Sequence, residues 1–263
     1  LELDDDTLIE NEFLIVPGGT QGKSALCIHR NNKLTHLPDR KFSSPDVHPR
    51  NKEQRFALHI LSDDSIPLVC LTGRAGSGKT LCAIAAGIEQ TIGMDGAGAG
   101  RRDNPYKKLI VSRPVQPLGK DIGFLPGTMH EKMLPWLMPI QDNLQTLLGN
   151  NKSALEMYVE SGKIEIEALT YIRGRSISNA YIIIDEAQNL TPHEVKTVIT
   201  RAGEGTKIIL TGDPYQIDNP YVDATSNGLT YIVERFKDSP VAGHVTLRKG
   251  ERSQLAELAA KLL

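Results

Sequence analysis

The stretch that decides the fold reads Ile66-Pro67-Leu68-Val69-Cys70-Leu71-Thr72-Gly73-Arg74-Ala75-Gly76-Ser77-Gly78-Lys79-Thr80. Its first half is a short apolar, β-prone run, which predicts a buried strand. Its second half fits the pattern G-x-x-x-x-G-K-[ST], and apolar residues recur at helical spacing over residues 81–92. A strand, a glycine-rich turn and a helix therefore follow one another in the order that a phosphate-binding loop requires.

The residues of this turn are suited to holding phosphate. Glycines lack a Cβ atom, so the chain can turn tightly and point N–H groups inward, where the positive end of the next helix adds to the anion site. Lys79 supplies a charge for the β- and γ-phosphates, and the Thr80 hydroxyl is a ligand for Mg²⁺. The alternative is a chance match in a turn that caps an ordinary helix, which the flanking strand and helix disfavour. The expected nucleotide contacts here are Gly73, Arg74, Ala75, Gly76, Ser77, Gly78, Lys79, Thr80 and Leu81.

Gln54 lies just upstream of the phosphate loop, in a predicted helix that begins near residue 51. Its side-chain amide both donates and accepts hydrogen bonds, which matches the N6/N7 edge of adenine. Gln54 is therefore a candidate adenine contact, with a plain surface glutamine as the alternative.

The first 45 residues differ from the rest of the chain. Short β-prone runs occupy residues 11–16 and 25–30, and Arg30-Asn31-Asn32-Lys33 predicts a hairpin turn before a third run. We expect residues 1–45 to form a small β subdomain or a linker arm, and residues 46–263 to form one P-loop domain. Because the chain starts at Leu1 and not at methionine, we expect it to be a fragment of a longer protein.

The composition is that of an ordinary globular protein, and from the sequence we expect neither a membrane span nor a signal peptide. The chain has 263 residues, of which 40% are hydrophobic and 24% charged. Its formal net charge of −2 excludes a polybasic nucleic-acid binder, although local basic clusters remain. The three cysteines, Cys27, Cys70 and Cys82, lie far apart, which favours reduced thiols and a cytoplasmic setting over disulfides or a zinc site.

From residue 66 onward, apolar β-prone runs alternate with helical segments. This alternation predicts an α/β fold, with a mostly parallel sheet flanked by helices. Ligands of such sheets bind beyond the carboxyl ends of the strands. We therefore expect one crevice to be lined by four residues that follow predicted strands, namely Gly73, Arg113, Asp185 and Asp213.

Asp185 and Glu186 follow the most hydrophobic run in the chain, residues 181–184. The first carboxylate is expected to complete Mg²⁺ coordination through water, and the second to take a proton from an attacking water. The alternative is a pair of acidic residues that merely ends a buried strand. Gln216 follows another strand and is a candidate sensor of the γ-phosphate or the lytic water, although its segment by itself indicates only a turn.

Several motifs resemble those of a known family. Asp185-Glu186-Ala187-Gln188-Asn189 resembles motif II of superfamily 1 helicases, and Gly212-Asp213-Pro214-Tyr215-Gln216 resembles their motif III. More specifically, the chain is similar to PhoH-family ATPases over about residues 50–263. The residues that carry this similarity also include Gly123-Phe124-Leu125-Pro126-Gly127, Glu131-Lys132, Arg173-Gly174-Arg175 and Ser178-Asn179-Ala180. The N-terminal arm weakly resembles the segment that joins a PIN nuclease to the PhoH domain in two-domain proteins.

The resemblance implies a RecA-like core in which the strand at 207–210 lies between the strands that precede Gly73 and Asp185. It also implies ATP, Mg²⁺, a single-stranded RNA partner and a homo-oligomeric ring, with a hexamer as the expected size. A neighbouring subunit would then supply an arginine finger. Arg252, at the start of a predicted helix, is the first candidate and Arg248 the second, with ordinary surface cations as the alternative.

The expected activity is ATP hydrolysis that drives an RNA helicase or translocase. Candidate RNA contacts are Arg113 and Lys120 on a long irregular loop, together with Arg173 and Arg175. One alternative is a nucleotide-switched ring scaffold that regulates an attached PIN ribonuclease. Another is a small-molecule kinase, which would need an acceptor pocket and a lid.

Overall fold

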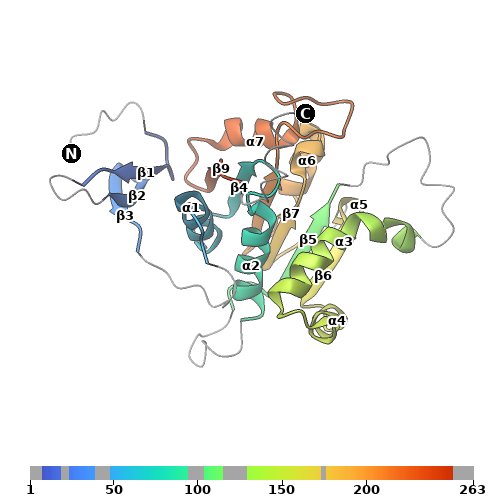
Figure 1. Ribbon diagram of the computed structural model, residues 1–263. Coiled ribbons are helices and arrows are strands. Elements are labelled where there is room, and N and C mark those ends of the chain that lie inside the picture. The colour runs from blue at the N-terminus through green and yellow to red at the C-terminus, as the bar shows by residue number, and fades with distance from the viewer. Residues whose placement is uncertain are drawn as a thin grey trace.

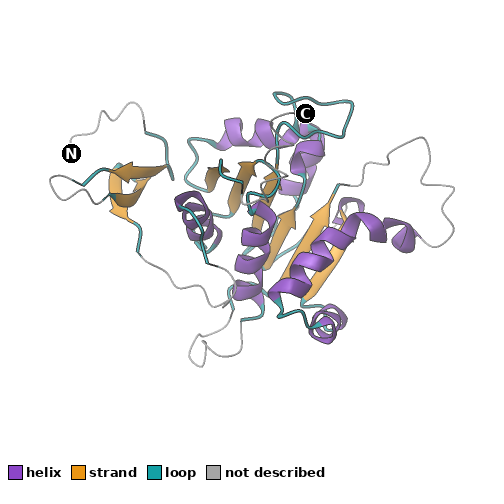
Figure 2. Ribbon diagram, viewed as in Figure 1, coloured by secondary structure: helices purple, strands orange, loops and turns teal. Residues whose placement is uncertain are grey.

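The computed structural model of the protein describes residues 8–18, 24–38, 48–93, 104–114, 129–172 and 176–250. These residues form a small antiparallel sheet near the N-terminus and a six-stranded parallel sheet with helices on both faces (Figures 1 and 2). The predicted α/β fold with a small N-terminal β unit is confirmed. None of the described helices is long and apolar enough to cross a membrane.

The large sheet has the strand order β6-β5-β7-β8-β4-β9, and every neighbouring pair is parallel. β8 lies between β4 and β7, as the resemblance implied, so one strand separates the phosphate loop from the acidic pair. Their carboxyl ends share one edge of the sheet, which is where such folds bind ligands. In sheet order the strands are β6 (Ile164–Ala168), β5 (Lys108–Arg113), β7 (Ala180–Ile184), β8 (Lys207–Gly212), β4 (Leu68–Gly73) and β9 (Ala242–Leu247).

The central strands are buried on both faces, which is why they read as continuous apolar runs. Every residue of β7 and of β8 is buried. One face packs against α1 (Lys52–Leu61), α2 (Lys79–Thr91), α3 (Met129–Leu147) and α4 (Lys152–Glu160). The other packs against α5 (Leu169–Ile172), the 3₁₀ turn η2 (Ala187–Asn189), α6 (Pro192–Ile199) and α7 (Gly228–Phe236).

The helix ends follow local sequence signals. Thr191 caps α6 in a reciprocal pair of bonds with Glu194, and proline occupies the first helical position. Two prolines, Pro135 and Pro139, lie inside α3. Buried Leu137, between these two prolines, helps to anchor α3 in the core, which offsets the backbone hydrogen bonds that proline removes.

The N-terminal sheet consists of β1 (Phe13–Val16), β2 (Ala25–Arg30) and β3 (Lys33–His36), paired in that order. Asn31 and Asn32 join β2 to β3, and both have positive φ angles, 49° and 57°. A two-residue hairpin turn of this kind matches the twist of the strands. The predicted hairpin at residues 30–33 is therefore confirmed.

Ring stacking, an ion pair and hydrogen bonds anchor the N-terminal segment to the rest of the structure. The Phe13 ring stacks on Phe56 of α1 with 4.7 Å between ring centroids, and Arg30 pairs with Asp63 at 2.6 Å. The buried Asn11 side chain donates to the carbonyl oxygen of Ala242 in β9 at 2.8 Å. The described part of the N-terminal segment is therefore a docked sheet beside α1 and β9 (Figure 1); the domain boundary near residue 45 stays a prediction.

Candidate nucleotide-binding site

The phosphate loop joins β4 to α2 and depends on glycines in conformations that other residues avoid. Gly73, Gly76 and Gly78 have φ angles of 146°, 79° and 89°. A Cβ atom on Gly73 would also collide with the carbonyl oxygen of Leu247 in the neighbouring strand β9. Gly78 is the N-cap of α2 and offers no side chain to its first amides, so the positive end of the helix faces the loop.

Two polar side chains inside the loop are consistent with the predicted phosphate site. Lys79 is buried, and its Nζ donates to the carbonyl oxygens of Gly73 at 2.6 Å and Arg74 at 3.0 Å. The Ser77 hydroxyl is fully buried and has no hydrogen-bond partner among the described residues. Buried polar atoms without partners are rare. An ammonium resting on loop carbonyls beside an unsatisfied hydroxyl fits a nucleotide phosphate.

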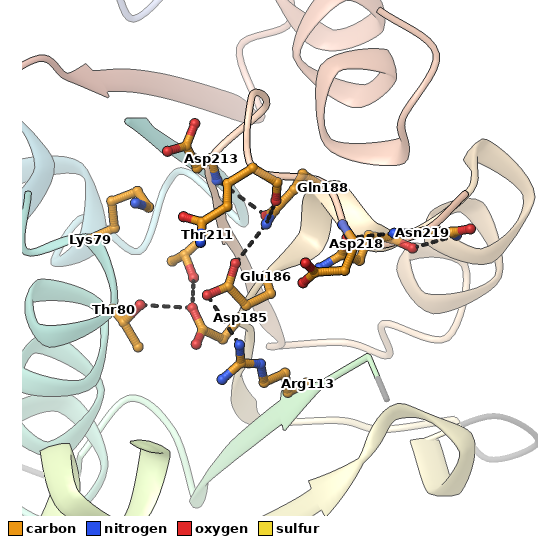
Figure 3. Close-up of polar contacts among 12 residues, drawn as sticks. Lys79, Thr80, Arg113, Asp185, Glu186, Gln188, Thr211, Asp213, Asp218 and Asn219 are labelled. Atoms are coloured by element: carbon orange, nitrogen blue, oxygen red, sulfur yellow. Dashed lines mark hydrogen bonds and ion pairs between the residues drawn. The ribbon is translucent and has the colours of Figure 1, made fainter. Parts of the chain in front are cut away.

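The carboxylate of Asp185 links the phosphate loop to the centre of the sheet. Its Oδ1 accepts hydrogen bonds from Thr80 Oγ1 at 2.7 Å and from Thr211 Oγ1, at the end of β8, at 2.6 Å (Figure 3). Hydroxyl and carboxylate oxygens are ligands that Mg²⁺ accepts. No cluster of three or more His, Cys, Asp or Glu side chains occurs in the described ranges. A divalent ion here would therefore rely on Thr80, Asp185 and oxygen atoms of the substrate.

Glu186 is held from two sides. Its backbone adopts the left-handed conformation, with φ of 54°, which an ordinary residue rarely adopts. Its Oε2 accepts a hydrogen bond from Gln188 Nε2 at 2.6 Å, and its Oε1 lies 3.3 Å from Arg113 Nη2 (Figure 3). The carboxylate therefore sits in a defined place next to Asp185, between the ends of β5, β7 and β8.

Gln188 and Asn189, both buried, tie η2 to the loop that follows β8. Gln188 accepts from the Asp213 backbone N–H at 3.1 Å and donates to the Gln216 carbonyl oxygen at 2.8 Å. Asn189 Oδ1 accepts from the Asp218 backbone N–H at 2.7 Å. The acidic pair and the loop after β8 are therefore joined by one network of hydrogen bonds.

The side chain of Gln54 contacts the phosphate loop. Its Nε2 donates to the Ser77 carbonyl oxygen at 3.0 Å, and its Oε1 accepts from the Arg50 backbone N–H at 2.9 Å. The side chain is buried, so it is not the plain surface glutamine that the sequence left open. With both ends of its amide engaged in this way, its observed contacts brace the loop, and the adenine contact stays a prediction.

The other predicted site residues lie at differing distances from this edge. Gln216 is exposed, and its backbone carbonyl oxygen accepts a hydrogen bond from Gln188. Its role as a sensor stays a prediction. Arg248 is exposed one residue beyond Leu247, which pairs with Gly73 across the sheet, and its N–H donates to Glu53 at 2.8 Å. The positions that fall outside the described residues are Lys120, Arg173, Arg175 and Arg252.

Sequence reasoning missed two residues that shape the site. Thr211 is not among the predicted site residues, and Gln188 appears only within the motif that resembles helicase motif II. For Thr211 the available signal was a hydroxyl at the end of an apolar strand. For Gln188 it was an amide two residues after Glu186, but only the 3₁₀ turn directs that amide back onto the carboxylate.

The buried thiols are not part of this site. All three cysteines are free and buried, which agrees with the expectation of reduced thiols. Burial raises the pKa of the Cys70 and Cys82 thiols to about 12. Because the thiolate is the reactive form, these two side chains serve packing rather than chemistry.

Comparisons with known proteins show the family of the chain. The family model described as PhoH-like protein matches residues 46–262. Protein PhoH2 of Bacillus subtilis (strain 168) is 56% identical over 219 residues, which are 82% of this chain and 48% of that protein. Protein PhoH of Escherichia coli (strain K12) is 36% identical over 217 residues, or 81% of this chain and 58% of that protein. The chain thus spans about half the length of these relatives.

Solved structures are more distant. The large terminase from the thermophilic bacteriophage D6E is 14% identical, with a TM-score of 0.45, and the match covers 81% of this chain and 50% of that one. For a Pif1 helicase from Bacteroides the identity is 17% and the TM-score 0.39, over 80% and 44% of the two chains. The family match and the relatives decide the assignment: the chain belongs to the PhoH family, and its phosphate loop and acidic pair make it a P-loop NTPase.

Proposed function

We propose that the protein hydrolyses ATP with Mg²⁺ and couples hydrolysis to movement on single-stranded RNA. The observation that carries the ATPase part is the bond between Thr80 of the phosphate loop and Asp185 of the acidic pair, 2.7 Å long across 105 residues of chain. This bond brings the loop and the acidic pair together at one edge of the sheet. Neither motif alone supports the proposal as strongly as their meeting does.

Each residue of the site has a task in this proposal. The loop amides and Lys79 would bind the nucleotide phosphates, and Thr80 and Asp185 would hold Mg²⁺. The metal ion supplies charge neutralisation on the phosphate oxygens. Glu186 would take the proton of the attacking water, held in orientation by Gln188. Gln216 is the proposed sensor, on a loop that Gln188 and Asn189 join to the base.

The kinase alternative is weaker than hydrolysis. Glu186 is a second carboxylate placed directly beside the expected metal ligand, which suits activation of water more than the positioning of an acceptor molecule. The scaffold alternative assumes that nucleotide binding, without hydrolysis, lets a ring regulate an attached PIN ribonuclease. A variant that binds nucleotide without hydrolysing it separates the scaffold from the motor.

RNA, the ring and its arginine finger are supported by basic residues near the site and by the motif resemblance. Arg248 is exposed at the end of β9, next to the phosphate-loop strand, and is a candidate finger for a neighbouring subunit. Arg252 remains the other candidate. Arg113, on the carboxyl edge of the sheet, leads the proposed RNA contacts with Lys120, Arg173 and Arg175.

The direct test measures phosphate release with Mg²⁺ or with EDTA, with and without a single-stranded RNA, alongside the native mass. Glu186→Gln should lower turnover about 10²–10⁴-fold and leave nucleotide affinity intact, because it removes only the base. Glu165→Gln is a matched control on β6, at a different ion pair. A Glu186→Gln variant with wild-type turnover would show that the base is misassigned. If instead the variant loses turnover but keeps its biological output, the result favours the scaffold.

A further inference from the structure

The two partners of Glu186 differ in how firmly they are held. Gln188 is fully buried and bonded to the backbone of Asp213 and Gln216 as well, so it is a fixed partner. The Arg113 side chain is 22% exposed, the Glu186 side chain is 30% exposed, and their closest N–O distance is 3.3 Å. One contact to the proposed base is therefore rigid, and the other is a longer ion pair open to solvent.

The backbone of Arg113 is fixed beside the acidic pair. Arg113 is the last residue of β5, and Ser112 before it pairs with Ile184 at the end of β7. The Asp185 backbone N–H also donates to the Ser112 carbonyl oxygen at 2.8 Å. The guanidinium can therefore leave Glu186 only by turning its side chain, because the strand itself is locked in the sheet.

This pairing opposes the reaction that Glu186 is expected to perform. A general base needs a carboxylate oxygen that can contact the attacking water. The Arg113 guanidinium occupies one oxygen of the base while Gln188 occupies the other. In this arrangement both carboxylate oxygens are held by protein groups, and the side chain is restrained.

We propose that Arg113 is a positioning residue that restrains Glu186 until a nucleic-acid phosphate draws the guanidinium away. Arginine offers carboxylate and phosphate the same planar fork of donors, so the two anions compete for one side chain. The inference rests on the proposed ATPase function. It gives the nucleic acid a direct means of controlling hydrolysis through one partly exposed residue at the edge of the site.

The same strand provides a matched control. At the opposite end of β5, Lys108 pairs with Glu165 of β6 at 2.6 Å, and both side chains are 27% exposed. This pair is shorter and equally accessible, but neither residue borders the acidic pair. Removing it tests the loss of a surface ion pair without touching the base.

The kinetic experiment compares wild type, Arg113→Ala, Arg113→Lys and Lys108→Ala. Initial rates of ATP hydrolysis are measured over a range of ATP concentrations, with and without a 20-nucleotide oligouridylate. Arg113→Ala should raise the basal kcat several-fold, towards the stimulated wild-type rate, with KM within about twofold and no further stimulation. Arg113→Lys should keep part of the restraint and part of the stimulation, and Lys108→Ala should match the wild type.

A binding experiment reads the same competition without turnover. Fluorescence anisotropy of a labelled oligouridylate is measured in the absence of nucleotide. Glu186→Gln should bind it several-fold more tightly than wild type, because a neutral amide no longer holds Arg113. The gain should vanish in the double variant Arg113→Ala/Glu186→Gln, and Glu165→Gln should show none.

The outcomes separate the inference from the proposed function. The restraint is overturned if the basal kcat of Arg113→Ala falls or stays unchanged while this variant has the same unfolding temperature as Lys108→Ala. A wild type that hydrolyses ATP without stimulation by the oligonucleotide overturns release by nucleic acid but leaves the ATPase standing. A wild type without hydrolysis overturns the proposed function itself.

Discussion

The side-chain amide of Gln188 donates to the carboxylate of Glu186, with 2.6 Å between Nε2 and Oε2. The two residues are neighbours on one short turn, and Glu186 reaches the bond through a left-handed backbone conformation. Backbone strain of this kind is typical of functional sites, where surrounding bonds hold it in place. The site thus positions its proposed base with a residue that touches no substrate in the mechanism.

Gln188→Ala should lower kcat about tenfold or more and leave the KM for ATP nearly unchanged, because orientation of the base is lost while the phosphate loop is intact. The variant should also lose about 1–3 kcal/mol of unfolding free energy, since the buried N–H of Asp213 and the partly buried carbonyl oxygen of Gln216 lose their partner. Steady-state kinetics and urea unfolding measure the two effects. A loss of stability with unchanged kcat would contradict the orienting role.

Thr80→Val should weaken nucleotide binding about tenfold or more when Mg²⁺ is present and have little effect in EDTA. The substitution keeps the shape of the side chain but removes the hydroxyl that bonds to Asp185 at 2.7 Å. Titration of a fluorescent ATP analogue under both conditions makes the comparison. Thr211→Val, which removes the other bond to Asp185, is the control, and an equal loss in EDTA would argue against a metal ligand at Thr80.

Gly73→Ala should destabilise the fold and abolish nucleotide binding. Its φ of 146° excludes residues with a side chain, and the added Cβ would collide with the Leu247 carbonyl oxygen in β9. We expect a loss of about 2 kcal/mol or more, measured by thermal unfolding. Gly250→Ala is the matched control because, among the described residues other than its chain neighbours, no atom lies within 4 Å of the added Cβ. Equal melting temperatures of the two variants would disprove the collision.

Lys207 should make stability depend on pH. Its side chain is fully buried, and Nζ donates to the carbonyl oxygens of Ile60, Asp63 and Ile66 at 2.7–2.8 Å. Burial lowers the pKa of Lys207 to about 7 from its ordinary value of 10.5. Between these two values the unfolded chain binds more protons than the folded one, so stability contributed by this group rises with pH.

Urea unfolding at pH 7.5, 8.25 and 9 tests this dependence against Lys207→Met. The wild type should gain stability relative to the variant as the pH rises, by up to about 1.4 kcal/mol per unit. At every pH, Lys207→Met should be the less stable protein, because the carbonyl groups around Nζ lose their hydrogen-bond donor. A wild-type curve parallel to that of the variant would mean that Lys207 keeps its proton throughout.

Much of the fold was accessible from the sequence because its signals are local. Glycines and hydrophobic periodicity predict the strand, turn and helix around residues 66–92, and the structure has β4 and α2 there. The apolar run before Asp185 is β7, buried on both faces. Even the turn at Asn31 and Asn32 was readable, because only a few residue types tolerate positive φ.

The sequence by itself therefore determined which elements form and which residues stand at the carboxyl ends of the strands, since backbone propensity and burial pattern act over a few neighbouring residues. Only the tertiary structure decided which side chains meet. Gln54 braces Ser77, Thr80 reaches Asp185 across 105 residues, and Arg113 turns towards Glu186. These contacts depend on side-chain directions and strand order, and those are set by packing of the whole sheet with its helices.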